Sequence, residues 1–217
     1  MLGLGGVVIV GGLLFAASGT IDWAQGWTFL ALWAIATASP HVALARENPS
    51  LLTRRARNPS RGRPHERVMV VVRGLCLLAI AVLAGLETQR LGVADLPVWL
   101  VYPGTLMVLL GGVIEGWAMT ENNHYEAGMR IQRDVGHKVV YHGPYRIVRH
   151  PGYLAVIIRT AGAPLVLGSI WAWIPAGVII ATMMARALIE DRALREELKG
   201  YIAYTRQVPT MLLPGVW

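Results

Sequence analysis

Long apolar runs, separated by short polar segments, dominate this chain. A helix needs about 20 mostly apolar residues to cross the hydrocarbon core of a bilayer. Only 15% of the residues are charged, whereas soluble domains usually carry about 25%. We therefore expect most of the chain to be solvated by lipid. The candidate spans are Leu2–Ser18, Trp27–Leu44, Val68–Leu86, Val98–Met119, Tyr153–Leu167 and Ile170–Ile189.

Local signals refine the two ends of this series. Pro164 and the pair Gly168-Ser169 predict a tight hairpin between the last two spans. Apolar residues at helical spacing predict a further helix over Glu190–Tyr204. Glycines are frequent in the first span, which predicts a close approach of neighbouring helices there.

The predicted fold class is therefore all-α, a polytopic transmembrane helix bundle. We expect five to six spans in one domain over residues 1–217, with the last two spans forming a helical hairpin. Residues 1–119 would hold the four N-terminal spans, and residues 120–217 the remaining, more polar portion.

The distribution of positive charge predicts how the chain is oriented. The segment Arg46–Arg67 contains seven arginines, whereas the loops Gly19–Gly26 and Glu87–Pro97 contain Arg90 as their one cation. Short loops rich in Lys and Arg stay in the cytoplasm. We therefore expect an integral protein of a bacterial inner membrane with both termini cytoplasmic. This topology explains the net charge of +7, so the lipid bilayer, and no nucleic acid, is the expected partner.

One polar and aromatic stretch, His137–Tyr153, leads directly into the fifth span. Pro151 falls near the first turn of that helix, where a missing N–H costs no hydrogen bond. The free N–H groups and the dipole of such a helix start favour an anion or a carboxylate. The stretch is therefore a candidate cofactor site on the cytoplasmic face.

The motifs of this region occur in a specific order. Gly143-Pro144-Tyr145 precedes Arg149-His150-Pro151-Gly152-Tyr153; Arg186-x-x-x-Glu190-Asp191 and then Tyr201-x-x-Tyr204 follow. This series resembles the isoprenylcysteine carboxyl methyltransferase family and the related phospholipid methyltransferases. The resemblance covers roughly Asn122 to the C-terminus. It implies that residues 120–217 form a catalytic portion, with a cytoplasmic loop that binds S-adenosylmethionine and a C-terminal helix.

The resemblance also implies roles for individual residues. Arg186 and Glu190 would be catalytic; Arg186 would contact the methyl acceptor and Glu190 an amine or ribose hydroxyl of the cofactor. We consider His124 and Arg159 weaker candidates for the acceptor site, Arg159 because a charge inside a span is a functional candidate. The implied cofactor-binding residues are Gln132, His137, Lys138, Val139, Val140, Gly143, Tyr145, His150, Pro151, Gly152, Tyr153, Glu190, Tyr201 and Tyr204.

The acceptor stays open between a lipophilic or small-molecule carboxylate, thiol, amine or phenol. A plainer interpretation makes Arg186 and Glu190 a simple intrahelical pair and the tyrosines an interfacial aromatic belt. The histidines match no common zinc spacing, so no metal is expected. Two other functions remain: an NADPH-dependent membrane reductase of the sterol-reductase type, and a non-catalytic membrane scaffold.

Overall fold

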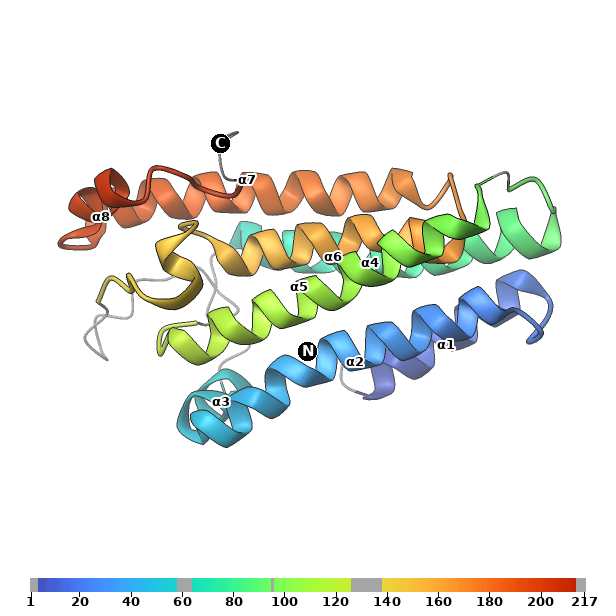
Figure 1. The fold of residues 1–217 in the computed structure, drawn as a ribbon, viewed down its shortest axis with the longest axis horizontal. Coiled ribbons are helices and arrows are strands. Elements are labelled where there is room, and N and C mark those ends of the chain that lie inside the picture. The colour runs from blue at the N-terminus through green and yellow to red at the C-terminus, as the bar shows by residue number, and fades with distance from the viewer. Residues whose placement is uncertain (1–3, 58–63, 95, 126–137, 214–217) are drawn as a thin grey trace.

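The computed structural model describes residues 4–57, 64–94, 96–125 and 138–213, with side chains described for all of these except 4, 54–57 and 64–66. Within these ranges every regular element is a helix (Figure 1). The long helices are α1 (Leu4–Ser18), α2 (Ala24–Glu47), α4 (Pro64–Gly85), α5 (Val101–Glu121), α6 (Pro151–Leu167) and α7 (Trp173–Glu197). The short ones are α3 (Pro49–Arg57), η1 (Leu86–Arg90), η2 (Val98–Leu100), η4 (Gly143–Arg146) and α8 (Tyr201–Gln207).

Four helices have the length and apolar composition of membrane spans. They cover Ala24–Glu47, Arg67–Arg90, Val98–Glu121 and Trp173–Glu197. Two more apolar helices, α1 and α6, are shorter, with 15 and 17 residues. At about 1.5 Å per residue, α6 is roughly 26 Å long, close to the ~30 Å thickness of the hydrocarbon core. The prediction of a polytopic helical bundle is confirmed.

The long helices lie side by side along the long axis of the molecule (Figure 1). Helix α5 packs on α2 and α6, and α4 packs on α1 and α7, while α6 and α7 form the predicted hairpin. Gly168, with a positive φ of 68°, ends α6 at the turn of this hairpin. The common core contains fully buried or nearly buried Phe29, Ile80, Val108 and Met183.

Glycines allow close helix contacts between α5 and α6, and also between α4 and α1, where a Cβ on Gly85 would lie 2.6 Å from the Leu14 carbonyl oxygen. A Cβ on Gly104 would come within 2.8 Å of the backbone nitrogen of Val166, and one on Gly162 within 2.7 Å of the Gly104 carbonyl oxygen. In α1 itself, a Cβ on Gly11 would lie 2.9 Å from the Leu30 side chain of α2, whereas Gly5 and Gly12 have no atom within 4 Å of such a Cβ. The prediction that glycines of the first span mediate close helix packing is therefore wrong for these two positions.

The predicted tail helix over Glu190–Tyr204 is also wrong in its boundaries. Helix α7 continues without interruption to Glu197, and the chain then turns at Gly200, whose φ is 89°. A separate short helix, α8, follows. The positive φ explains the break, because glycine adopts this conformation without the steric cost that other residues meet.

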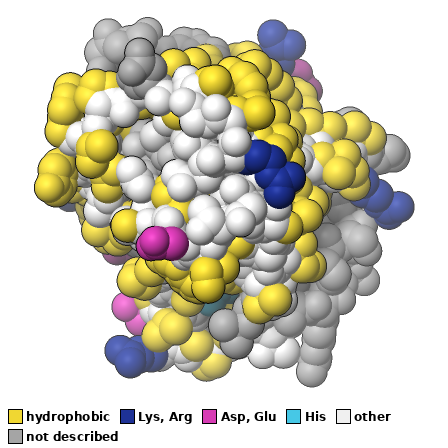
Figure 2. Space-filling model, turned by 90° about the vertical axis from the view of Figure 1, so that its right-hand side faces the viewer, with side chains coloured by type: hydrophobic (Ala, Val, Ile, Leu, Met, Phe, Trp, Pro, Cys, Tyr) yellow, Lys and Arg dark blue, Asp and Glu magenta, His cyan; other side chains and the backbone are white. Residues whose placement is uncertain are grey.

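The two ends of the bundle differ in charge. Helices α3 and α8 lie at one end, the left end of Figure 1. Exposed cations at this end are Arg46, Arg67, Lys138, Arg146, Arg192, Arg195, Lys199 and Arg206. At the opposite end, viewed in Figure 2, hydrophobic side chains predominate and charged ones are isolated. Among the described cations, only Arg90 is exposed at that end.

Candidate active site

Tyr153 joins the two helices that carry the main motifs. Its hydroxyl, on α6, donates a hydrogen bond to a carboxylate oxygen of Glu190 on α7. The guanidinium of Arg186, one turn before Glu190, lies over the Tyr153 ring at 5.4 Å from its centroid. The His150 ring stacks against Tyr153, with centroids 5.7 Å apart and planes inclined by 23°. The structure thus brings four of the predicted site residues together.

The start of α6 has the geometry that the sequence predicts. Pro151 is the first helical residue, and the amide of Leu154 is the first to bond within the helix, to the His150 carbonyl at 3.1 Å. The N–H groups of Gly152 and Tyr153 therefore have no intrahelical acceptor. A Cβ at Gly152 would lie 2.3 Å from the hydroxyl oxygen of Tyr125, so only glycine lets Tyr125 cover this helix start.

Asp191 organises the surroundings of this helix start. Its Oδ1 accepts hydrogen bonds from Arg149 Nε and from the Tyr201 hydroxyl, both at 2.8 Å. Its Oδ2 accepts one from Arg195 Nε at 2.7 Å. His150 Nε2 lies 3.5 Å from Oδ1, and this buried nitrogen has no hydrogen-bond partner. The carboxylate thus ties α6, α7 and α8 to one point.

The segment after α8, residues 208–212, packs against the corner formed by Arg149, His150 and the start of α6. The amides of Arg149 and His150 donate to the carbonyls of Thr210 and Met211, each at 3.1 Å. Arg149 Nη1 also donates to the carbonyl of Val208 at 2.9 Å. Met211 and Leu212 are buried against Val148, Leu154 and Ala187. The segment after α8 therefore holds the Arg-His-Pro corner in place by backbone pairing and apolar contact.

Tyr145 lies buried beneath this corner. Its hydroxyl accepts a hydrogen bond from the Asn122 amide at 3.0 Å, and its carbonyl accepts one from the Tyr204 hydroxyl at 2.7 Å. Gly143, with a φ of 57°, starts the short η4 turn, where a Cβ would collide with Glu121. Burial raises the pKa of Tyr145 well above its ordinary 10.0. The ring therefore stays neutral over the physiological range.

Tyr201 and Tyr204 of α8 bind Asp191 and Tyr145 through their hydroxyl groups. Both rings are buried, together with Leu198 and Val208, and Val139 packs against this cluster. Burial, reinforced by the neighbouring Asp191 carboxylate, raises the pKa of Tyr201 above its ordinary 10.0. Burial likewise raises the pKa of Tyr204, although the Arg149 charge opposes this. Both hydroxyls are engaged inside the protein.

The remaining predicted residues divide into three groups. Gln132 and His137 lie outside the described residues. Lys138 is exposed and Val140 is half-buried in the same segment, where the Lys138 amide donates to His124 Nε2 at 3.4 Å. Arg159 is buried inside the bundle, where Nη1 contacts Glu115 at 2.6 Å, so it lies in a deeper layer than the helix start.

Three residues near the site were missed from the sequence. Tyr125 covers Gly152, and only its position just after a span could have suggested it. Arg73 of α4 and Glu115 of α5 are charged residues within spans, and the rule that singled out Arg159 applies equally to them. Arg73 lies within electrostatic range of Glu115, Arg159 and Arg186.

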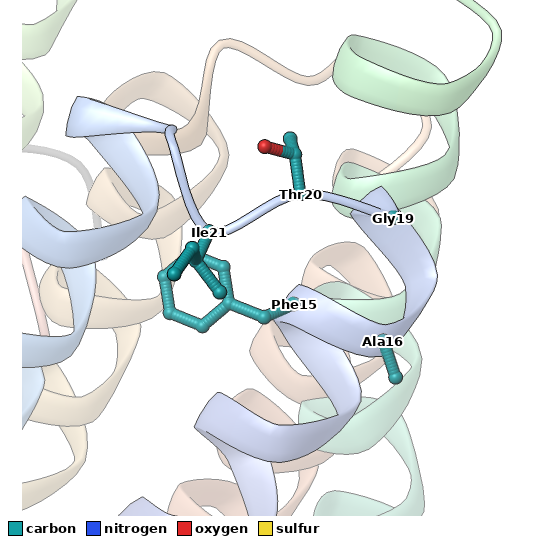
Figure 3. Close-up of a pocket in the computed structure, with 5 residues that line it drawn as sticks. All are labelled: Phe15, Ala16, Gly19, Thr20 and Ile21. Carbon is teal, nitrogen blue, oxygen red and sulfur yellow. The ribbon is translucent and has the colours of Figure 1, made fainter.

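Two further features lie apart from this arrangement. A surface pocket at the other end of the bundle is lined by Phe15, Ala16, Gly19, Thr20 and Ile21 (Figure 3). None of these belongs to the predicted site. Among the residues with described positions, no group of three His, Cys, Asp or Glu side chains is arranged to hold a metal ion.

Fold and site together define a polytopic helical membrane protein with a tyrosine- and charge-lined site where α6 and α7 meet at the cation-rich end. Residues 99–199 match the phospholipid methyltransferase family. This range includes Tyr145, His150, Tyr153, Arg186 and Glu190. These residues thus resemble the phospholipid methyltransferases, and the relatives below support membership of that family and the related isoprenylcysteine carboxyl methyltransferases.

Individual relatives agree with this assignment. A probable protein-S-isoprenylcysteine O-methyltransferase of Oryza sativa subsp. indica is 38% identical over 71 residues, which are 32% of this chain and 37% of that protein. Protein-S-isoprenylcysteine O-methyltransferase B of Arabidopsis thaliana is 26% identical over 115 residues, 52% of this chain and 58% of that protein. The alignments thus span less than two thirds of either relative.

Proposed function

We propose that the protein is an S-adenosylmethionine-dependent methyltransferase with a lipophilic or small-molecule acceptor at the cytoplasmic membrane face. The observation that carries this proposal is the convergence of His150, Tyr153, Arg186 and Glu190 at the start of α6, inside the region that matches a methyltransferase family. Residues 120–217 are then the catalytic portion, and the N-terminal spans support it.

The residues present fit the proposed cofactor. S-adenosylmethionine has a carboxylate, an amine, ribose hydroxyls and a positively charged sulfur. The free N–H groups of Gly152 and Tyr153 suit the carboxylate, and the Glu190 carboxylate suits the amine or a hydroxyl. The His150 ring, which stacks on Tyr153 and lies 3.5 Å from the Asp191 carboxylate through Nε2, adds a second ring beside Tyr153. Aromatic faces such as that of Tyr153 stabilise a cation.

The chain's own residues would act mainly by positioning. When bound, S-adenosylmethionine supplies an activated methyl group on sulfur. Glu190 and Tyr153 hold one side of the site in a fixed geometry through their shared hydrogen bond. Arg186, beneath the Tyr153 ring, orients an anionic acceptor, because a guanidinium binds a carboxylate with two parallel hydrogen bonds. Fixing two reactants in line lowers the barrier without a strong general base.

The distribution of charge supports a cytoplasmic site. The exposed cations of the described residues gather at the end that holds α3, η4 and α8, and Arg90 lies at the other. The positive-inside rule then orients the site toward the cytoplasm. The acceptor would reach it sideways from the bilayer, because the site lies where spans α6 and α7 leave the apolar region.

Calorimetric titration of the detergent-solubilised protein with S-adenosylmethionine tests the proposal. We expect binding that Glu190→Gln weakens about 10- to 100-fold, the effect of losing a charged hydrogen bond. Gly152→Ala should also weaken binding, since a Cβ there displaces Tyr125. Arg90→Gln, at the opposite end of the bundle, is the matched control and should bind normally.

A second experiment distinguishes the methyltransferase from the reductase and the scaffold. Transfer of radiolabelled methyl from the cofactor to N-acetyl-S-farnesylcysteine, a probe suggested by the names of the relatives, would support the methyltransferase. The same titration is repeated with NADPH. Folded protein that binds NADPH and not S-adenosylmethionine would refute the proposal in favour of a reductase, and binding of neither would favour the scaffold.

A further inference from the structure

Helix α3 combines a high density of positive charge with a position directly at the end of a span. The span α2 ends at Glu47, and α3 begins two residues later, at Pro49. Glu47 is the one acidic residue of the stretch 46–57. The cations of the same stretch are Arg46, Arg54, Arg55 and Arg57. In the proposed orientation this stretch adjoins the cytoplasmic end of the span, where such a cluster of cations is typical of segments that bind anionic lipid headgroups.

One side of α3 packs on the bundle. Leu51 is fully buried and forms a cluster with Leu44 of α2 and Met119 of α5. The residues Ser50 and Thr53 of the same helix are exposed. A helix that is rich in arginine and apolar on one side is suited to the boundary between the lipid headgroups and the hydrocarbon core. Both the charge and the packing of α3 therefore fit a place at the membrane surface.

Asn48 joins α3 to the end of α5. Its side-chain oxygen accepts hydrogen bonds from the Ser50 hydroxyl at 2.7 Å and from the Leu51 amide at 3.1 Å. These bonds cap the start of α3. The side-chain nitrogen of Asn48 donates to the side-chain oxygen of Asn123, which lies just after α5. The position of α3 is therefore coupled to the turn that follows α5.

The turn after α5 also contacts residues that we propose to bind the cofactor. The side-chain amide of Asn122 donates to the Tyr145 hydroxyl at 3.0 Å. The side chain of Tyr125 covers Gly152 at the start of α6 and also packs against the cluster around Leu51. One short turn thus contacts α3 on one side and the candidate active site on the other.

We propose that α3 is a binding surface for anionic phospholipid headgroups, and that lipid bound there orders the segment 138–150, which carries Tyr145 and His150. The headgroup phosphates neutralise the arginines beside the span and hold α3 at the membrane surface. Asn48 then keeps the turn after α5 in place, so that less ordering remains to be done when a cofactor binds. The lipid surface is independent of the proposed function, whereas its effect on cofactor affinity rests on that function.

Native mass spectrometry of the detergent-solubilised protein tests the lipid surface. The probes are short-chain phosphatidylglycerol, which is anionic, and phosphatidylcholine of the same chain length, which is zwitterionic. The test variant combines Arg54→Gln, Arg55→Gln and Arg57→Gln. The matched control also loses three cations, which are exposed on α7, on α8 and between them; it combines Arg192→Gln, Lys199→Gln and Arg206→Gln. Thermal unfolding establishes that each variant is folded.

We expect the wild type to prefer phosphatidylglycerol and the α3 variant to bind it at least about tenfold more weakly, because each arginine near an anionic headgroup contributes roughly fivefold. Binding of phosphatidylcholine should be unchanged. The control should lose less than about threefold, because its cations are spread over two helices and screened from one another. A wild type without this preference, or equal losses in the two triple variants, would overturn the inference. If the α3 variant does not fold, Arg54→Gln combined with Arg57→Gln decides by the same comparison.

Hydrogen exchange of the backbone amides in residues 138–150 tests the coupling without any cofactor. The protein is compared in nanodiscs of phosphatidylcholine and in nanodiscs with added phosphatidylglycerol. We expect exchange at least about threefold slower in the anionic discs. Asn48→Ser should abolish this difference and keep the lipid affinity, because serine still caps α3 but is too short to reach Asn123. Equal exchange of the wild type in both discs, or a difference that persists in Asn48→Ser, would refute the coupling through Asn48.

Titration with S-adenosylmethionine in the same discs distinguishes this inference from the proposed function. The wild type should bind the cofactor at least about threefold more tightly in the anionic discs, and Asn48→Ser should bind it equally in both. A preference for phosphatidylglycerol and slower exchange, without any binding of S-adenosylmethionine, would refute the methyltransferase and support the lipid surface. Cofactor binding of equal strength in both discs, without a preference for phosphatidylglycerol, would refute the lipid surface alone.

Discussion

Replacing Asp191 with alanine should destabilise the protein more than any other single change in the corner where α6, α7 and α8 meet. Its carboxylate accepts hydrogen bonds from Arg149, Arg195 and Tyr201 at 2.7–2.8 Å. The Arg149 side chain is only 6% exposed. Without Asp191, this buried guanidinium loses its carboxylate partner, while it keeps carbonyl acceptors in the segment after α8.

The magnitude follows from that burial. Removing one partner of a buried ion pair costs about 3–5 kcal/mol, because the remaining charge stays desolvated. The carbonyl of Val208 still accepts from Arg149, which favours the lower value, about 3 kcal/mol. For a protein of this size each kcal/mol lowers the unfolding midpoint by roughly 2–4 °C. We therefore expect Asp191→Ala to lower that midpoint by about 6–12 °C.

The assay is thermal unfolding of wild type and variants in the same detergent, followed by intrinsic fluorescence. Arg195→Gln is the matched control: it removes one bond to the same carboxylate, but the Arg195 side chain is 43% exposed. Exposed pairs contribute about 0–1 kcal/mol, so its shift should not exceed a few degrees. Equal shifts for Asp191→Ala and Arg195→Gln would refute the idea that Asp191 holds the corner together through Arg149.

Two other predictions concern Glu87 and Tyr145. Glu87 is fully buried at the opposite end, where its carboxylate accepts hydrogen bonds from the Ser169 hydroxyl and from the amides of Ile170 and Trp171 in the α6–α7 turn. Glu87→Ala should lower the free energy of unfolding by about 2–3 kcal/mol, because it leaves these donors unpaired. Asp22→Ala, at an exposed position, is the control and should be neutral in the same unfolding assay. Burial raises the pKa of Tyr145 above its ordinary 10.0, so the phenol ionises in the unfolded chain first, and the free energy of unfolding should fall as the pH rises past about 10. Tyr145→Phe should flatten that fall, and a parallel pH dependence of both proteins between pH 8 and 11 would contradict this.

The helices were predictable from sequence because helices surrounded by lipid need long runs of apolar residues. Each of the six apolar runs forms a helix, and Pro151 begins α6 as its position suggested. The end of α7 was not predictable in this way. Hydropathy falls after Ile189, yet the helix continues to Glu197, since Asp191 and Arg195 bond to each other along it and Asp191 bonds to Arg149.

The site was predictable only as far as local motifs reach. His150, Tyr153, Arg186 and Glu190 lie together because α6 and α7 pack as an antiparallel hairpin; their roles stay a prediction. The partner of Arg149 and His150 could not be predicted from their neighbours in sequence: the carbonyls of Thr210 and Met211, about 60 residues later, complete their backbone bonds. Such pairing depends on where the chain returns after α8, which no local pattern encodes.

Tyr153 contacts both Arg186 and Glu190, and this links cofactor binding to acceptor binding in the proposed function. The Arg186 guanidinium lies over its ring, and its hydroxyl donates a hydrogen bond to Glu190. A cofactor that takes the Glu190 carboxylate competes with the Tyr153 hydroxyl for it. The freed ring can then shift over Arg186, changing how much of that guanidinium faces an acceptor. In the proposed function, cofactor and acceptor therefore bind with coupled affinities, and the coupling passes through Tyr153.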